Sequence, residues 1–202
     1  MNDKVRAADG RDEFAFTPDN AERAREVIAR YPPGRQASAV LALLDLAQRQ
    51  NGGWLPRAAM DSVADMLGMA PIRVYEVGTF YSMLHLEPVG RHVVNVCTTT
   101  PCWLRGSDAV LAACKKALGI DLDETTEDGL FTLKEVECMG ACVNAPMMEI
   151  DGDYYEDLDA ESAERVLAAV KRGETPKAGS QIGRASSEPA TGPTTLKETG
   201  GG

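Results

Sequence analysis

The chain has 202 residues, of which 44% are hydrophobic and 26% are charged, as in ordinary soluble globular proteins. Its net charge is −10 at pH 7, so it lacks the basic surface that binding to nucleic acid phosphates requires. No apolar run reaches the roughly 18 residues of a membrane-spanning helix, and the N-terminal residues lack the apolar segment of a secretory signal. We therefore expect a cytoplasmic bacterial protein with no nucleic acid partner and no direct insertion into a membrane.

The first half of the chain is predicted to form a small helical bundle. Apolar residues recur at helical spacing in AERAREVIARY, in ASAVLALLDLAQRQNGG, from Pro56 to Gly68 and from Pro71 onward. Proline and glycine residues separate these segments, as expected for helix starts and ends. The residues predicted to form its core are Ala21, Ala24, Val27, Ile28, Met60, Val63, Ala64, Leu67, Ile72, Tyr75, Phe80 and Leu84.

The second half alternates short β-branched segments with amphipathic ones. RHVVNVC and LFTLKEVEC are predicted strands, and GSDAVLAACKKALGI and SAERVLAAVKRG are predicted helices. MMEIDGDYYE predicts a hairpin, because Asp151-Gly152 is a strong two-residue turn signal. The resulting β-α-β-β-α order predicts a small open sheet flanked by helices, so the whole chain belongs to the α+β class.

Composition divides the chain into three predicted regions. Residues 14–88 form the helical bundle, and Pro88-Val89-Gly90 marks the boundary to the sheet domain at 89–174. Residues 175–202 are rich in Gly, Ser, Thr and Pro and poor in large apolar residues. Such a composition cannot bury enough apolar surface to fold alone, so this tail is predicted to be disordered, or ordered only against a partner.

Four cysteines in two close pairs are the strongest chemical signal in the sequence. The pairs are Cys97-x4-Cys102 and Cys138-x3-Cys142, and the first cysteine of each pair ends a predicted strand. Ends of adjacent strands lie about 5 Å apart, so the two pairs can approach each other. Four thiols, in a chain with only two histidines, favour an iron–sulfur cluster or a structural zinc over a hard-metal site.

Several alternatives remain open at the level of cysteine spacing. Zinc is the strongest, although its cysteine pairs more often have two intervening residues. A dithiol redox site usually has Cys-x-x-Cys, which is absent here, and a structural disulfide is disfavoured in the cytoplasm. The fifth cysteine, Cys114, lies in a predicted helix and is interpreted as a small buried hydrophobic residue.

Polar residues around the first pair are candidate hydrogen-bond donors to sulfur. They are Thr98, Thr99, Thr100, Trp103 and Arg105, and the N-terminus of the predicted helix after Gly106 is a further candidate. A cluster held by four thiolates carries about −2 when oxidised, so an acidic protein has to offset that charge locally. The sequence contains no Walker loop and no G-x-G-x-x-G motif after a strand, and it shows no catalytic group of its own.

Long segments of the sequence resemble the thioredoxin-like [2Fe–2S] component of bacterial complex I, which is the E subunit of NADH:quinone oxidoreductase. The resemblance is carried by VCTTTPCWLRGSD, GLFTLKEVECMGACVNAPMMEI and DYYEDL, and upstream by YPPGRQASAVLALLDLAQRQNGGWLP and VYEVGTFYSMLHLEPVGR. It covers about residues 14–173. Relatives of this family also occur in NAD-linked hydrogenases and formate dehydrogenases.

The resemblance implies a fold, a cofactor and partners. The implied fold is an N-terminal helical docking bundle followed by a thioredoxin-like [2Fe–2S] ferredoxin domain. Cys97, Cys102, Cys138 and Cys142 are implied to ligate one [2Fe–2S] cluster. The chain would exchange single electrons with FMN in the NADH-binding subunit, which itself holds FMN and NADH, next to the large iron–sulfur subunit. The chain would thus be part of an enzyme on the cytoplasmic face of the inner membrane, attached through the complex.

Overall fold

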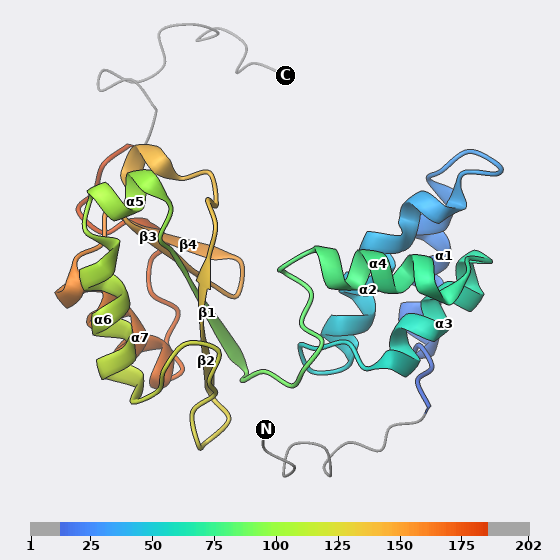
Figure 1. Cartoon of the computed structure of the whole chain (residues 1–202), viewed down its shortest axis with the longest axis horizontal. Coiled ribbons are helices and arrows are strands. Elements are labelled where there is room, and N and C mark those ends of the chain that lie inside the picture. The colour runs from blue at the N-terminus through green and yellow to red at the C-terminus, as the bar shows by residue number, and fades with distance from the viewer. Residues whose placement is uncertain (1–12, 186–202) are drawn as a thin grey trace, which may run out of the picture. The chain divides into compact units, whose positions relative to one another are not determined.

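The computed structural model describes residues 13–185, and in it the chain changes from helices to a mixed sheet at Val89–Gly90 (Figure 1). Of these residues, 13–89 form one unit and 90–185 form a second. The predicted α+β class is confirmed. None of the helices within residues 13–185 combines the length and the apolar character needed to cross a lipid bilayer.

The helical unit begins and ends its helices at the residues that favour such boundaries. Pro18 and Pro71 occupy first turns, where the missing N–H costs no hydrogen bond. The Thr17 hydroxyl caps the first helix, and Gly68 ends the third with φ 63°, a conformation that is easy only for glycine. The elements are α1 (Pro18–Ala29), the 3₁₀ turn η1 (Gln36–Ala39), α2 (Val40–Gln50), α3 (Arg57–Leu67) and α4 (Pro71–Phe80).

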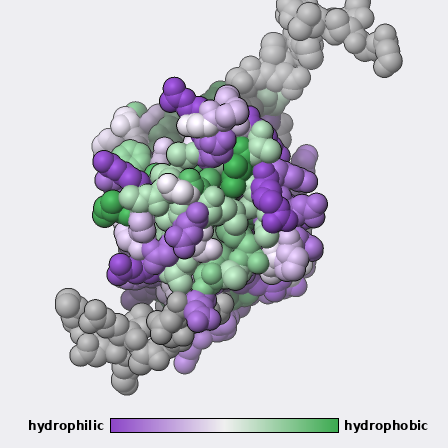
Figure 2. Space-filling view, turned by 90° about the vertical axis from the view of Figure 1, so that its right-hand side faces the viewer, coloured by the Kyte–Doolittle hydropathy of each residue, from purple (hydrophilic) through white to green (hydrophobic). Residues whose placement is uncertain are grey.

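The core of this unit agrees with the predicted apolar positions except on α4. Ala24, Met60, Val63, Ala64 and Leu84 are buried, and Ala21, Val27, Ile28, Leu67 and Tyr75 are partly buried. The prediction was wrong for Ile72 and Phe80, which are exposed; Phe80 retains 79% of its accessible surface. Figure 2 shows apolar residues in the middle of the face of this unit, with hydrophilic residues around them.

The second unit contains a five-stranded sheet in the order β2-β1-β3-β4-β5. The strands are β1 (His92–Cys97), β2 (Phe131–Val136), β3 (Met147–Ile150), β4 (Asp153–Glu156) and β5 (Gly179–Ser180). β1 runs parallel to β2 and antiparallel to β3. The predicted hairpin is confirmed, since Asp151 and Gly152 both have positive φ between β3 and β4.

Two long helices cover one face of this sheet and enclose its core. They are α6 (Ser107–Leu118) and α7 (Ala160–Lys171), which lie side by side against it (Figure 1). The core includes Val94, Val96, Phe131 and Leu133 from the strands. Cys114 on α6 is fully buried in this core, as predicted, and burial raises the pKa of its thiol to about 12.

The start of the predicted tail departs from the expected disorder. β5, within residues 175–185, pairs in parallel with β4, and the Gln181 amide donates to the Glu156 carbonyl at 2.9 Å. Backbone pairing at a sheet edge needs no large apolar side chains, so composition does not reveal it. The rest of the predicted tail, 186–202, lies outside the described residues.

The start of α7 provides a test of local stability. The Asp159 carboxylate accepts from the Ser162 N–H at 2.8 Å, and the Ser162 hydroxyl accepts from the Asp159 N–H at 2.8 Å. We expect Asp159→Ala to lower the free energy of unfolding by about 1 kcal/mol at pH 7, and Asp159→Asn, which keeps an acceptor, to cost little. Urea unfolding followed by circular dichroism measures both; equal losses would contradict the capping role.

The same cap predicts a pH dependence. Hydrogen bonds from the Ser162 side chain and backbone lower the pKa of Asp159 in the folded chain. A carboxyl group with a lowered folded-state pKa stabilises the fold above its unfolded pKa of about 4 and loses that effect as pH falls through the folded value. The stability difference between wild type and Asp159→Ala should therefore shrink below about pH 4.

Candidate metal centre

The sheet order places the segment with the second cysteine pair over the end of β1. β1 and β2 are parallel, so their C-terminal ends lie on the same side of the sheet. β3 lies next to β1 on its other flank, runs antiparallel to it, and therefore starts on that same side. The connection from β2 to β3, residues 137–146, therefore crosses the end of β1, where Cys97 is the last residue. This topology brings the two cysteine pairs together at one edge, as the strand positions predicted.

The first pair is buried. Cys97 ends β1, opposite Val136 of β2, and Cys102 lies in the short helix α5 (Thr100–Leu104) that follows. Each side chain retains only 1% of its accessible surface. The sequence predicts a loop at Cys102, and the structure differs because α5 is too short for a helical period to be visible.

The second pair is exposed and compact. Cys138 and Cys142 are both exposed, and their sulfurs lie 3.4 Å apart. Gly140 between them has φ 84°, which allows the tight reversal without steric strain, as expected for this position. Cys142 begins a 3₁₀ turn, η2 (Cys142–Asn144), and the Tyr154 hydroxyl donates to the Met139 carbonyl at 3.1 Å.

A small apolar cluster joins the two pairs. Ala141, which lies between Cys138 and Cys142, is buried together with Cys97 and Cys102, next to Ala145 and Met147. Met139 and Tyr154 pack against this cluster. The inner sulfurs are thus shielded from water, while the outer pair faces solvent. Shielding of this kind raises the energetic effect of every hydrogen bond or charge near the sulfurs.

The thiols do not ionise alike. Burial raises the pKa of the Cys97 thiol, but hydrogen bonding to Thr99 and the Met139 amide outweighs burial and leaves this pKa below its ordinary value. Burial, followed by hydrogen bonding to Cys97, raises the pKa of Cys102 to about 12. Hydrogen bonding to Cys138 raises the pKa of Cys142. The cysteines of each pair share a hydrogen bond through a thiol proton. A bound metal would displace these protons.

Among the predicted side-chain donors, all within residues 13–185, only Thr99 has a hydrogen bond with a cysteine sulfur. Thr99 Oγ1 lies 3.1 Å from Cys97 Sγ. The Thr98 hydroxyl instead donates to the Glu135 carboxylate at 2.6 Å, and Trp103 is exposed. The Met139 amide, in the loop between Cys138 and Cys142, also donates to the Cys97 sulfur.

The donor set fits a [2Fe–2S] cluster. Within residues 13–185, no three His, Cys, Asp or Glu side chains are arranged as a ready site for a single metal ion. The four cysteines stand as two pairs around one apolar cluster. Four cysteine sulfurs are the usual ligands of a [2Fe–2S] cluster, and the two pairs would together supply these four.

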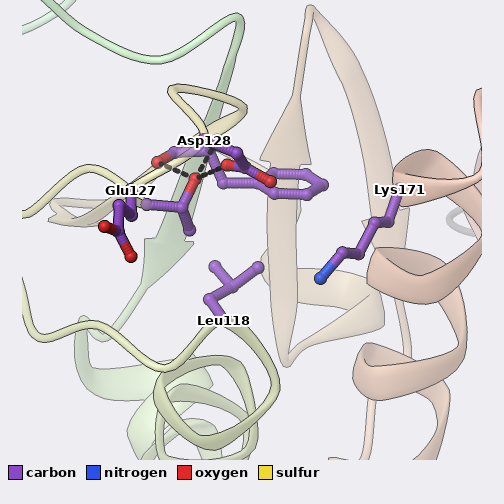
Figure 3. A pocket seen from close by; sticks show the side chains of 6 residues that line it. Leu118, Glu127, Asp128 and Lys171 are labelled. Atoms are coloured by element: carbon purple, nitrogen blue, oxygen red, sulfur yellow. Dashed lines mark hydrogen bonds between the residues drawn. The ribbon is translucent and has the colours of Figure 1, made fainter.

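A pocket in the same unit lies at the opposite end of β2 and has a different character. Its volume is about 450 Å³, and Phe131, the first residue of β2, helps to line it. Figure 3 shows Lys171 of α7 extending toward it and Leu118 on the opposite wall. Asp128 bonds the Thr126 hydroxyl at 2.5 Å and the Leu130 N–H at 3.0 Å, so its carboxylate shapes the turn. Asp128 and Thr126 thus serve the local fold.

Comparison with known proteins identifies the family. Residues 24–171 match the family described as thioredoxin-like [2Fe–2S] ferredoxin, and this span contains all four paired cysteines. The chain belongs to the thioredoxin-like [2Fe–2S] ferredoxin family. The fold and cluster type that the sequence resemblance implied are thereby confirmed at the level of the family.

Similar proteins extend the comparison over most of this ferredoxin-family chain. The E subunit of NADH-quinone oxidoreductase from Rickettsia conorii is 56% identical over 154 residues, which cover 76% of this chain and 92% of that protein. The mitochondrial NADH dehydrogenase [ubiquinone] flavoprotein 2 of Dictyostelium discoideum is 50% identical over 185 residues, covering 92% of this chain and 75% of that protein. These similarities confirm the resemblance to the E subunits of this oxidoreductase.

A solved structure supports the fold. The NAD+-reducing [NiFe]-hydrogenase in its H2-reduced state matches with a TM-score of 0.57 at 19% sequence identity. The match covers 68% of this chain and 23% of the hydrogenase chain, so this protein spans about a quarter of that chain. At this identity, the likeness concerns the fold alone.

Proposed function

We propose that the chain is an electron-transfer subunit of an NADH:quinone oxidoreductase and that Cys97, Cys102, Cys138 and Cys142 hold its [2Fe–2S] cluster. The observation that carries this proposal is the convergence of two cysteine pairs around one apolar cluster at the end of β1. Family membership supports the cluster type, and the relatives named as E subunits of NADH-quinone oxidoreductase support the complex.

The two cysteine pairs differ in their exposure to solvent. Cys97 and Cys102 provide the buried ligands, and Cys138 and Cys142 provide the exposed ones. When bound, the cluster would supply one-electron oxidation and reduction. Thr99 and the Met139 amide stabilise negative charge on the Cys97 sulfur by hydrogen bonding.

Exposed apolar residues beside the cysteines support a docked partner. The large exposed hydrophobic residues in the described part of the second unit are Trp103, Leu104, Val143 and Ile182. Trp103 and Leu104 follow Cys102, and Val143 follows Cys142. Exposed aromatic and aliphatic side chains around a redox site suit a protein interface that brings a second cofactor close.

The proposed partner at this surface is the subunit that binds FMN and NADH, with the large iron–sulfur subunit adjacent. Single electrons pass between FMN in that partner and the site on this chain. The chain is then a peripheral subunit, held on the cytoplasmic face of the inner membrane through its partners. The names of its relatives support an oxidoreductase complex.

The first test is to purify the full chain anaerobically, assay iron and acid-labile sulfide, and record an EPR spectrum after reduction with dithionite. We expect about two irons and about two sulfides per chain, and a rhombic EPR signal from a total spin of one half. One zinc ion without sulfide or signal would overturn the electron-transfer proposal, because zinc has no redox chemistry.

A further inference from the structure

A short C-terminal segment, residues 177–185, lies against the turn that follows the second cysteine pair; we term it the strap. β5 within the strap pairs with β4, with Gly179 opposite Tyr155 and Ser180 opposite Glu156. The Gln181 side chain also donates to the carbonyls of Lys177 and Gly179, each at 3.0 Å. These bonds fix the strap along β4, and they bring Arg184, near its C-terminal end, to the end of β4.

The strap neutralises a buried carboxylate at the end of β4. The Asp157 side chain is only 3% exposed. Arg184 contacts both of its oxygens, with Nη2 at 3.0 Å from Oδ1 and Nε at 3.1 Å from Oδ2, and the Ser180 hydroxyl donates to Oδ2 at 2.6 Å. Two-point contacts between arginine and carboxylate are strong and fix orientation. A buried carboxylate without such partners would be costly.

The same guanidinium group also reaches the cysteine turn. Arg184 Nη2 donates to the Asn144 side-chain oxygen at 2.6 Å and to the carbonyl of Val143. Both residues belong to η2, which starts at Cys142. Asn144 is buried, and its amide donates to the Glu156 carboxylate at 2.7 Å. Arg184 thus joins the strap, the end of β4 and the turn that carries Cys142.

We infer that Arg184 is a positioning residue for Cys142, acting through Val143 and Asn144, so that the strap holds the exposed cysteine pair in place. This inference rests on the proposed function, in which Cys138 and Cys142 are ligands. Both cysteines are exposed, so contacts of their own side chains with a core do not fix them. Val143 is exposed as well, so the turn is held by Asn144 and its partners and by the buried alanines on either side of it, Ala141 and Ala145.

Residues that orient metal ligands typically change metal affinity by about 10- to 100-fold when they are replaced. We therefore expect Arg184→Gln to release iron to an excess of chelator on the order of tenfold faster than wild type, measured by loss of visible absorption in the full chain. We also expect a changed EPR line shape in the reduced protein, because the Cys142 sulfur shifts when its turn loosens.

Arg172→Gln is the matched control. Arg172 pairs with Glu174 at 2.8 Å on the surface and contacts neither η2 nor Asp157. Its replacement removes an arginine from the same part of the chain, and iron release and the EPR spectrum should remain as in wild type. An effect of equal size in this variant would overturn the inference.

The double variant Asp157→Asn/Arg184→Gln separates positioning from charge compensation. It leaves no unpaired carboxylate, and asparagine tolerates the positive φ of 54° at position 157, so the double variant gives the measurement even if Arg184→Gln fails to fold. Fast iron release should persist, because the contacts with Val143 and Asn144 are still missing. Release at the wild-type rate would overturn the inference while leaving the proposed function intact; a wild-type chain without iron and sulfide would overturn the proposed function itself.

Discussion

Replacing Cys102 or Cys138 by alanine is expected to reduce iron and sulfide from about two of each per chain to near zero, because a [2Fe–2S] cluster requires four protein ligands. The two variants test different parts of the site, since Cys102 is buried after β1 and Cys138 is exposed after β2. The measurements are iron and sulfide content and the visible spectrum of the anaerobically purified chain. Retention of the full cluster in either variant would contradict the proposed ligand set.

Cys114→Ala is the matched control for these variants. Cys114 is the fifth cysteine, and it lies in α6, within the core between the sheet and the helices. This core is separate from the small group of buried apolar residues that contains Cys97 and Cys102. Removing its sulfur leaves a small cavity that costs about 1 kcal/mol of stability. Iron and sulfide should remain at wild-type levels. If iron and sulfide were lost in this variant too, their loss in the Cys102 and Cys138 variants would reflect a less stable fold and not the removal of a ligand.

The boundaries of most elements follow from local chemistry, which is why the sequence predicts them. Proline at first turns, glycine after last turns and Asp151-Gly152 in the hairpin act over a few residues. The placement of both cysteine pairs at strand ends is predictable for the same reason. Local signals do not give the order of the strands. This order brings residues 137–146, which connect β2 to β3, across the end of β1.

The failures have a common cause in contacts that are distant along the chain. Helical periodicity places Ile72 and Phe80 on one side of α4 but does not tell whether another element covers that side; both are exposed. The composition of the strap predicts disorder, because the segment is poor in apolar residues. Its order depends on backbone pairing with β4 and on a buried carboxylate, Asp157, which is 27 positions from Arg184. No local sequence pattern predicts that Asp157 and Arg184 form an ion pair.

Gly90→Ala is expected to lower the free energy of unfolding of the second unit by about 3 kcal/mol, near the upper end for overpacking. A Cβ at Gly90 would lie 2.7 Å from the Phe131 carbonyl carbon and 2.9 Å from its nitrogen. These are backbone atoms of β2, and the Gly90 N–H donates to the buried Thr132 hydroxyl at 2.6 Å, so neither side can move away easily. Urea unfolding followed by circular dichroism measures the loss.

Gly78→Ala serves as the control for this prediction, because its clash involves a flexible side chain. The added Cβ would lie 2.8 Å from the Met60 sulfur, and methionine readily adopts another rotamer. Gly78 lies inside α4, where alanine is favoured over glycine by about 1 kcal/mol, so the net effect on stability should be small. Equal stability of the two variants would show that β1 and β2 can separate at Gly90 without cost.

The effect of Gly90→Ala should also reach the cysteines. His92 pairs with Phe131 in the first step of the β1–β2 ladder, which ends with Cys97 opposite Val136. Displacing the start of β1 therefore disturbs the strand that positions Cys97. The variant should lose iron to a chelator more readily than Gly78→Ala does, because the helical unit that contains Gly78 holds none of the four paired cysteines.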